Sequence, residues 1–315
     1  MELSAGIRKR AKELGFSECR IIRIQPLTDE KARFENWLRQ GMHGEMDYMA
    51  RNVEKRINPA LLLDHAKSMV IVIKNYATEK KQADPAAPVV SKYAYGDDYH
   101  DVMRGKLVEL LKYIRENVPG STGRVFVDSA PILERAYGRK AGLGWIGKNS
   151  SLISPEYGSF FFIGEILFDS ELLYDEPKII NDHCGTCTRC MDACPTKAIV
   201  AKAVVDARRC ISYQTIENKG DLDIAFKGLF GNRIFGCDIC QEVCPWNRKV
   251  KPNCEPAFQP DRKFLEMNEK EWFLMDQRAF GDLFGKSPLM RTGYKGIRRN
   301  LEFLKTEGSD HGATF

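Results

Sequence analysis

The sequence has no long apolar segment. Its apolar runs, such as residues 69–73 and 160–163, are far shorter than the about 18 residues that a membrane-spanning helix requires. The first residues, MELSAGIRKRAKELGF, have neither the apolar core nor the cleavage site of a secretory signal. Of the 315 residues, 43% are hydrophobic and 29% are charged, which excludes a disordered or fibrous chain. We therefore expect a cytoplasmic globular protein, large enough for two domains and without a membrane partner.

Histidine is scarce, and several familiar catalytic motifs are missing. The five histidines form no cluster, and the chain has no H-E-x-x-H, G-x-S-x-G or P-loop motif. Asp98, Tyr99 and His100 begin the D-x-H-x-x-G pattern by which some proteins offer a histidine to the cobalt of cobalamin. Met103 stands where that pattern requires glycine, so the pattern fails. His100 is therefore more typical of a hydrogen-bonded residue at the start of a helix.

Residues 142–147, GLGWIG, fit the G-x-G-x-x-G pattern of dinucleotide-binding sites. That interpretation requires a strand before the glycines and a helix after them. Here a helix-like segment precedes them and a polar loop follows. We instead expect a tight glycine loop that lets the backbone approach a large ligand, with Lys148, Asn149 and Ser150 lining it.

Residues 1–178 alternate between helix and strand patterns. The expected strands are residues 19–24, 68–76, 124–128 and 159–168, and the expected helices are residues 4–14, 28–39, 99–118 and 131–142. Ser4 and Thr28 are candidate N-caps of the first two helices. The pattern breaks near residue 178, where we place a domain boundary. A cysteine-rich part (179–255) and a short helical, basic part (256–315) follow, with helices expected near 268–280 and 293–304.

Cysteine is the abundant residue, and all ten cysteines except Cys19 lie between residues 184 and 254. In a reducing compartment such enrichment indicates metal binding rather than disulfides. The segment HCGTCTRCMDACP places Cys184, Cys187, Cys190 and Cys194 at C-x2-C-x2-C-x3-C, with a proline directly after. This is the bacterial ferredoxin spacing for 4Fe–4S clusters, in which the fourth cysteine binds the other cluster of a pair.

A second set of cysteines completes the pattern. Cys237, Cys240 and Cys244 lie in GCDICQEVCPWN, and Cys210 is available for the missing fourth position. The ferredoxin crossover then assigns one cluster to Cys184, Cys187, Cys190 and Cys244, and the other to Cys194, Cys210, Cys237 and Cys240. Structural zinc is the alternative, but zinc ribbons usually carry two well-separated C-x2-C pairs. We expect Cys19 to be a small core residue and Cys254 to be no ligand.

Two weaker signals leave alternatives open. Asp128 follows a predicted strand and precedes Ser129, so it is either an acid/base group at a pocket or the cap of the next helix. The C-terminal part carries basic residues that are opposed only by Glu302. These form either a solvated helix face or an electrostatic footprint for nucleic acid. The basic residues are Lys286, Arg291, Lys295, Arg298, Arg299 and Lys305.

Four segments together resemble the epoxyqueuosine reductase family: FVDSAPILERAYGRKAGLGWIGKNS, HCGTCTRCMDACPTKAI, CISYQTIE and IFGCDICQEVCPWN. The resemblance extends from about residue 4 to beyond residue 254. It implies an α+β fold with a nitroreductase-like cobalamin-binding domain, a ferredoxin-like domain with two 4Fe–4S clusters and a short helical C-terminus. The implied activity is reduction of the epoxide of epoxyqueuosine, at the wobble position of tRNA, to the alkene of queuosine.

The resemblance also implies roles for individual residues and partners. Asp128 matches the proton donor of the family, and Lys148, Asn149, Ser150 and Ser212 match regions that contact the corrin. Arg56 and His100 are weaker candidates for the same pocket. The implied partners are tRNA, gripped by the ferredoxin-like domain and the basic C-terminal part, and an external low-potential electron donor. The alternative functions are a corrinoid reductive dehalogenase-like reductase of a small molecule and a simple electron carrier.

Overall fold

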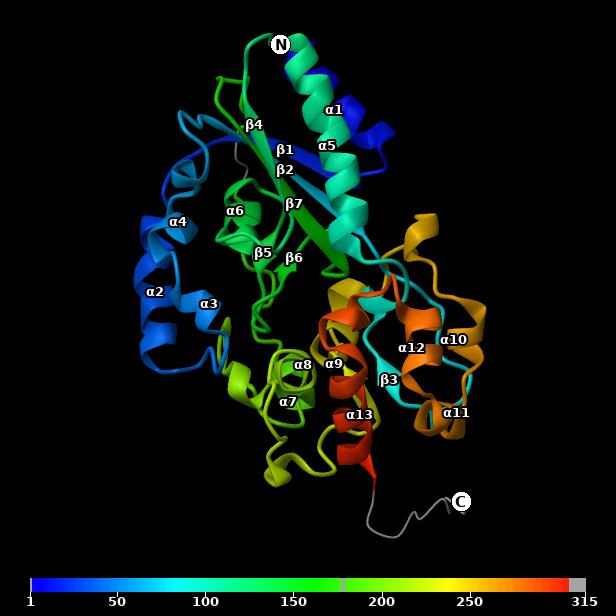
Figure 1. Cartoon of the computed structure of the whole chain (residues 1–315). Helices are drawn as coiled ribbons and strands as arrows, with labels where there is room; N and C mark the ends of the chain where they lie inside the picture. The colour runs from blue at the N-terminus through cyan, green and yellow to red at the C-terminus, as the bar shows by residue number, and fades with distance from the viewer. Residues whose placement is uncertain (1, 177–178, 306–315) are drawn as a thin grey trace.

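The centre of the molecule is a four-stranded antiparallel sheet in the order β1-β2-β7-β4 (Figure 1). The computed structural model describes residues 2–176 and 179–305. The strands are β1 (Glu18–Arg23), β2 (Ser68–Asn75), β4 (Gly123–Phe126) and β7 (Phe161–Phe168). All four predicted strands are confirmed, with shifts of one or two residues at their ends.

Helices cover both faces of this sheet, as Figure 1 shows. The helices α1 (Glu2–Glu13) and α5 (Tyr99–Asn117) pack on one face, and α6 (Glu134–Lys140) packs on the other. Successive side chains of a strand point to opposite faces, so a strand covered on both sides is apolar throughout. β7 follows this rule at every position except Glu165, which is fully buried on the α6 face.

The first two helices do not have the N-cap residues that the sequence predicts. α1 begins before Ser4, which lies inside the helix and is buried; its Oγ accepts the backbone N–H of Leu173 at 3.1 Å. α2 (Thr28–Arg39) begins at Thr28 itself, and its N-cap is Leu27, which makes no side-chain cap. Both cap predictions are therefore wrong. Two short helices, α3 (Asp47–Ala50) and α4 (Val53–Ile57), follow α2.

Three two-stranded sheets complete the strand pairing among the described residues. The strands are β5 (Trp145–Ile146) with β6 (Leu152–Ile153), β8 (Ile199–Ala201) with β9 (Val204–Val205), and β3 (Val89–Val90) with β10 (Arg233–Phe235). The β3–β10 pair is parallel and joins the first half of the chain to the cysteine-rich segment.

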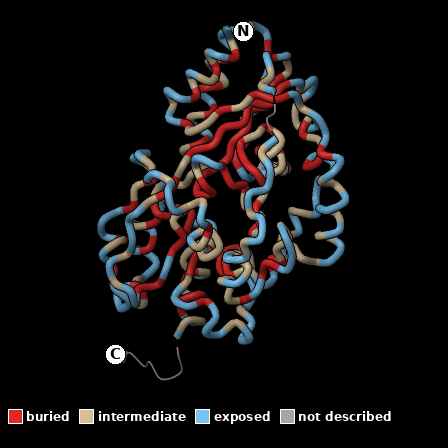
Figure 2. The backbone as a smooth tube through the Cα atoms, turned by 180° about the vertical axis from the view of Figure 1, so that it is seen from behind, coloured by how far each residue is buried: buried red, intermediate tan, exposed pale blue. Residues whose placement is uncertain are grey.

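The second half of the chain consists of short helices around a separate core. The helices are α7 (Arg189–Ala193), α8 (Ile211–Ile216), α9 (Ile239–Glu242), α10 (Arg262–Glu266), α11 (Glu269–Leu274), α12 (Gln277–Phe284), the 3-10 helix η7 (Pro288–Arg291) and α13 (Gly293–Leu304). Trp272, Phe284 and Leu301 of the last helices pack with Ala94 and Ile234. The tube coloured by burial in Figure 2 shows the two buried regions of the molecule. This second core therefore draws on residues from widely separated parts of the chain.

The proposed domain limits of 1–178, 179–255 and 256–315 stay predictions. The first limit falls on residues 177–178, outside the part of the chain that the structure describes, and residues 306–315 lie outside it as well. Among the described residues, no helix has the length and apolar character needed to cross a membrane.

The glycine segment 142–147 is shaped by packing against the β6 strand. A Cβ on Gly144 would overlap the backbone carbonyl of Ile153, and a Cβ on Gly147 would lie 2.5 Å from the side chain of Ile153. Both glycines therefore let the β5–β6 hairpin close, and the expected approach of the glycine backbone to a ligand is not what these two residues provide.

Gly144→Ala tests this packing. We expect it to destabilise the protein by about 1–3 kcal/mol, because the neighbouring backbone must move, and to lower the midpoint of urea unfolding. Gly105→Ala is the matched control, since Gly105 lies in α5 with nothing within 4 Å of an added Cβ. The control should gain about 0.5–1 kcal/mol from helix propensity. Equal midpoints for the two variants would contradict the packing argument.

Candidate active site

A large cavity lies between the central sheet and the cysteine-rich segment, with a volume of about 1410 Å³. Its wall includes side chains from α2, from the start of α5, from the segment after β4 and from α8. Six of the seven predicted site residues other than cysteines line it: Arg56, His100, Asp128, Asn149, Ser150 and Ser212. Ligand sites for drug-sized molecules are about 300–1,000 Å³, so this cavity has room for a larger group or for two ligands.

Asp128 lies at the cavity wall, two residues after the end of β4. Its φ is 53°, a left-handed conformation that aspartate tolerates better than most residues. The hydroxyl of Tyr99 donates to Asp128 Oδ2 at 2.6 Å, and His100 Nε2 lies 3.6 Å from the same oxygen. The Asp128 side chain is 55% exposed, because it faces the open cavity. Of its two predicted roles, this placement favours the acid/base group over the helix cap.

His100 is held between two carboxylates. Asp98 Oδ1 lies 2.7 Å from His100 Nδ1 and also accepts the backbone N–H of His100, which caps α5. Burial alone would lower the pKa of His100, but Asp128 and Asp98 outweigh it and raise the pKa to about 9. Burial would likewise raise the pKa of Asp128, yet His100 and Tyr99 lower it below its usual value. Near neutral pH, the imidazolium therefore holds the proton and Asp128 is ionised.

The loop after the glycines contributes two of its three predicted residues to the cavity. The Asn149 side chain is buried and donates to the Cys240 carbonyl at 3.4 Å, and Ser150 has a φ of 64°. Lys148 differs from the expectation: it is absent from the cavity wall, and its Nζ donates to the Gly185 carbonyl at 2.8 Å. The Lys148 side chain extends to the first cysteine loop, because the Gly185 carbonyl there accepts a hydrogen bond from its ammonium group.

Arg56 is a buried cation at the cavity wall. One guanidinium nitrogen donates to the Tyr48 carbonyl at 2.7 Å, whereas its Nε has no hydrogen-bond partner among the described residues. A buried donor without a partner is costly, so the site is suited to an acceptor group on a ligand.

The thiols form two groups. Burial raises the pKa of Cys190, and the negative charges of Cys184 and Cys244 raise it further. Burial also raises the pKa of Cys244, and the negative charges of Cys184 and Cys187 add to that rise. We call these four the first thiol group. The second thiol group is Cys194, Cys210, Cys237 and Cys240, in which burial and then neighbouring thiols raise the pKa of Cys210 and Cys240. The ferredoxin crossover assigns these two sets to the two clusters, and that assignment stays a prediction.

The second thiol group lines the large cavity through all four of its cysteines. The first group lies against Trp145 and Trp246, and the indole N–H of Trp145 donates to Cys184 Sγ at 3.5 Å. The cavity is therefore bounded by Asp128 on the sheet side and by the second thiol group on the other.

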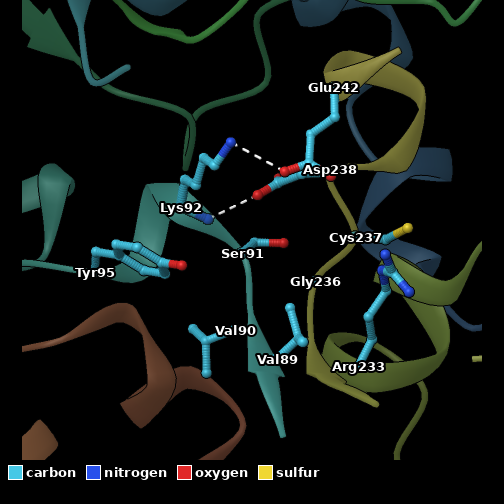
Figure 3. A pocket seen from close by; sticks show the side chains of 10 residues that line it. All are labelled: Val89, Val90, Ser91, Lys92, Tyr95, Arg233, Gly236, Cys237, Asp238 and Glu242. Atoms are coloured by element: carbon cyan, nitrogen blue, oxygen red, sulfur yellow. Dashed lines mark hydrogen bonds and ion pairs between the residues drawn. The ribbon is translucent and has the colours of Figure 1, made fainter. Parts of the chain in front are cut away.

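A smaller cavity, of about 40 Å³, lies beside Cys237 (Figure 3). Lys92 pairs there with Glu242 at 3.0 Å, and its backbone N–H donates to Asp238 at 2.8 Å. This volume suits one or two water molecules rather than a substrate. The contacts instead fasten the segment after β3 to helix α9, which carries Cys240.

The basic residues of the C-terminal part are largely engaged by the protein itself. Arg291 lines the cavity and pairs with Glu217 at 2.8 Å, and Arg298 pairs with Glu302 at 2.8 Å. Arg299 donates to the carbonyls of Asn218 and Gly220. These contacts favour a packed helix over a free electrostatic footprint.

Sequence reasoning missed several residues around Asp128. Tyr99 and Asp98 were noticed only as part of a failed motif. Arg135, which donates to the Ser150 carbonyl at 2.6 Å, and Glu134, which accepts the backbone N–H of Asp128 at 2.5 Å, were not singled out. The available signal was their place at the start of the helix that follows Asp128, six and seven residues after it.

Comparison with known proteins identifies related chains. Residues 183–247 match the family described as a 4Fe-4S double cluster binding domain, and residues 56–129 match the family described as epoxyqueuosine reductase QueG, DUF1730. The first match confirms the prediction of two 4Fe–4S clusters over structural zinc. The chain is 48% identical to an epoxyqueuosine reductase of Cellulophaga algicola over 299 residues, which is 95% of this chain and 97% of the relative. It is 42% identical to one of Pseudomonas aeruginosa, covering 95% of this chain and 84% of that protein.

Solved structures agree with these relatives. The epoxyqueuosine reductase of Streptococcus thermophilus superposes with a TM-score of 0.86 at 30% identity, covering 96% of this chain and 81% of that chain. An epoxyqueuosine reductase with an epoxyqueuosine-modified stem loop of tyrosine tRNA superposes with a TM-score of 0.88 at 32% identity, covering 96% and 80%.

Asp98→Asn tests the electrostatics of His100. The pKa of His100 should fall from about 9 towards the ordinary value of about 6.5, because one of the two carboxylates that favour the imidazolium is gone. Stability from the charged imidazole is fully present below about pH 6.5 and is lost as the pH rises through about 9. Titration of the imidazole by NMR measures the shift. Asp101→Asn, an exposed position on the same helix, should leave the titration unchanged, and an unaltered pKa in Asp98→Asn would refute the assignment.

Proposed function

The chain belongs to the epoxyqueuosine reductase family, and we propose that it reduces the epoxide of epoxyqueuosine in tRNA to the alkene of queuosine. The relatives that carry this name match nearly the whole chain. The observation that carries the proposal is the large cavity, because it brings an acid/base carboxylate, Asp128, and four cluster-binding thiols to one enclosed space.

The residues around this cavity fit cobalamin. The volume exceeds that of drug-sized sites, and the buried Arg56 Nε offers a donor without a partner. We infer that Arg56, Asn149, Ser150 and Ser212 hold the corrin. When bound, the corrin and the two clusters supply the electrons for the reduction. His100 has carboxylates at both ring nitrogens, so its position favours proton handling over binding of cobalt.

The chain itself supplies protons to the reaction. Reduction of an epoxide to an alkene takes two electrons and two protons and releases water. Because Asp128 is ionised and His100 is protonated near neutral pH, the proton starts on His100, and we infer that Asp128 passes it from His100 to the leaving oxygen. Asp98 is a positioning residue, since it fixes the ring of His100 through Nδ1. General acid catalysis of this kind is worth about 10²–10⁴ in rate.

The same proposal includes the topology of the sheet part, the cellular location and the electron donor. We infer a nitroreductase-like topology for the sheet part, which its antiparallel sheet with helices on both faces supports. A tRNA substrate supports a cytoplasmic location. An external low-potential electron donor is required, because the clusters and the corrin must return to their starting oxidation states after each turnover and the two electrons must come from outside the protein.

The test is an anaerobic reaction of the cluster-loaded protein with dithionite and epoxyqueuosine-containing tRNA, with and without cobalamin. Mass spectrometry of the nucleosides should show loss of one oxygen only when cobalamin is present. Absence of conversion with clusters and corrin intact would favour a reductase of a small molecule.

Asp128→Asn should retain the clusters, the corrin and tRNA binding, yet lose about 10²–10⁴ in kcat, since the amide cannot pass a proton to the leaving oxygen. Asp101→Asn is the matched control and should keep the wild-type rate. Turnover at the wild-type rate in Asp128→Asn would end the role of Asp128.

Cys194→Ala should remove the cluster bound by the second thiol group and retain the other cluster, although Cys194 lies in the same sequence motif as three cysteines of the first group. Iron analysis and EPR of the reduced protein measure the loss. Cys254→Ala, an exposed thiol outside both groups, should keep both clusters. Loss of the first group's cluster in Cys194→Ala would contradict the crossover.

A further inference from the structure

Glu165 is an unusual residue for its position. It lies in the middle of β7, paired with Ile71 of β2 on one side and Phe126 of β4 on the other, and it is 0% exposed. Neither carboxylate oxygen has a hydrogen-bond donor among the described residues. An ionised carboxylate buried in this way is very costly, so the group is expected to be neutral. Burial and the nearby Glu134 both raise the pKa of Glu165 well above its usual value.

Glu134 of α6 is the neighbour that Glu165 meets. The two carboxyl groups lie near enough to alter each other's pKa, and a hydrogen bond between them would need a proton on one of them. Glu134 also lines the large cavity, whereas Glu165 lies behind it. Burial, followed by the negative charge of Asp128, raises the pKa of Glu134 to about 8. Two adjacent carboxyl groups of this kind cannot both ionise and share one proton instead.

Glu134 connects this pair to the acid/base residue. Its Oε1 accepts the backbone N–H of Asp128 at 2.5 Å, at the residue whose φ is positive. The charged and titratable groups that face the pair and Asp128 come from several elements: Arg135 of α6, Tyr99 and His100 of α5, Arg56 of α4 and Arg291 of η7. None of the hydrogen bonds or ion pairs among the described residues joins a cation to Glu165.

We propose that Glu134 and Glu165 share one proton and form a second proton store of the active site, which Glu134 delivers into the cavity beside Asp128. The proposal rests on the proposed function. In that reaction both C–O bonds of the epoxide break, the C=C bond forms, two electrons enter from the external donor, and the oxygen leaves as water. The chain of Asp98, His100 and Asp128 supplies one proton, and the Glu134–Glu165 pair supplies the other.

Glu134 has a structural role that a test must keep separate. The side-chain oxygen of glutamine can still accept the Asp128 N–H, so Glu134→Gln retains this contact and removes the exchangeable proton. Glu165→Gln keeps the volume and a donor towards Glu134 but cannot take up or release a proton at neutral pH. Glu109→Gln, an exposed position on α5, is the matched control.

The first readout does not depend on turnover. Infrared spectra of the cluster-loaded protein, recorded against pH, detect the C=O stretch of a protonated carboxylic acid. The wild type and Glu109→Gln should show such a group at pH 7 that ionises around pH 8, and Glu134→Gln should lose this titration. Glu165→Gln should instead lose the carboxylic acid signal that persists above pH 8. A wild-type spectrum without a protonated carboxyl group at pH 7 would overturn the proposal, even if Glu165→Gln failed to fold.

The second readout is the pH profile of turnover. With unchanged iron content and tRNA affinity, Glu134→Gln should lower kcat at pH 7 by at least about tenfold and abolish the decline of kcat above about pH 8. Glu165→Gln should also lower kcat at pH 7. A wild-type kcat and profile in Glu165→Gln would overturn the proton store while leaving the proposed function standing. An intact infrared titration with no epoxide conversion by the wild type would overturn both the proposed function and the store's part in it.

Discussion

The active site depends on keeping one carboxylate, Asp128, ionised and fixed at the wall of a large cavity. Three residues from two helices hold it: Tyr99 and His100 at the start of α5 contact its side chain, and Glu134 of α6 accepts its backbone N–H. Tyr99 is itself fixed by stacking on Phe162 of β7 at a ring distance of 4.2 Å. Because α5 and α6 pack on opposite faces of the sheet, Asp128 is reached by both helices from its place just after the end of β4.

The cavity wall opposite Asp128 depends on how the two cysteine motifs share their thiols between the two groups. The first compact motif gives three thiols to the first group and one to the second, and the second motif gives two thiols to the second group and one to the first, so α7 and α9 lie side by side. The parallel β3–β10 pair and the shared core of Ala94, Ile234 and Trp272 hold this region against the sheet part. The second thiol group consequently faces the same cavity as Asp128, which lets electron supply and proton supply meet in one enclosed space.

Much of this arrangement follows from local sequence, and the rest requires the fold. The strands and the helix that begins at Tyr99 were predictable because the hydrophobic period is a local pattern. The presence of two 4Fe–4S clusters was predictable because ligand spacing is local as well. The direction of Lys148 was not, since it depends on a carbonyl of Gly185 brought close by folding. Glu165 was overlooked inside an apolar strand, because no local pattern shows that a carboxyl group of α6 lies opposite it. The sequence predicts Ser4 as a helix cap, but its hydroxyl oxygen instead accepts the backbone N–H of Leu173, which lies far along the chain.

Anomalous diffraction from crystals of the cluster-loaded protein with cobalamin would test the account most directly, because it locates each metal. The account predicts one cobalt peak inside the large cavity, between Asp128 and the second thiol group. It also predicts two separate sets of iron peaks, one at each thiol group. A cobalt peak outside this cavity would contradict the account. So would a single iron cluster bound by cysteines from both thiol groups.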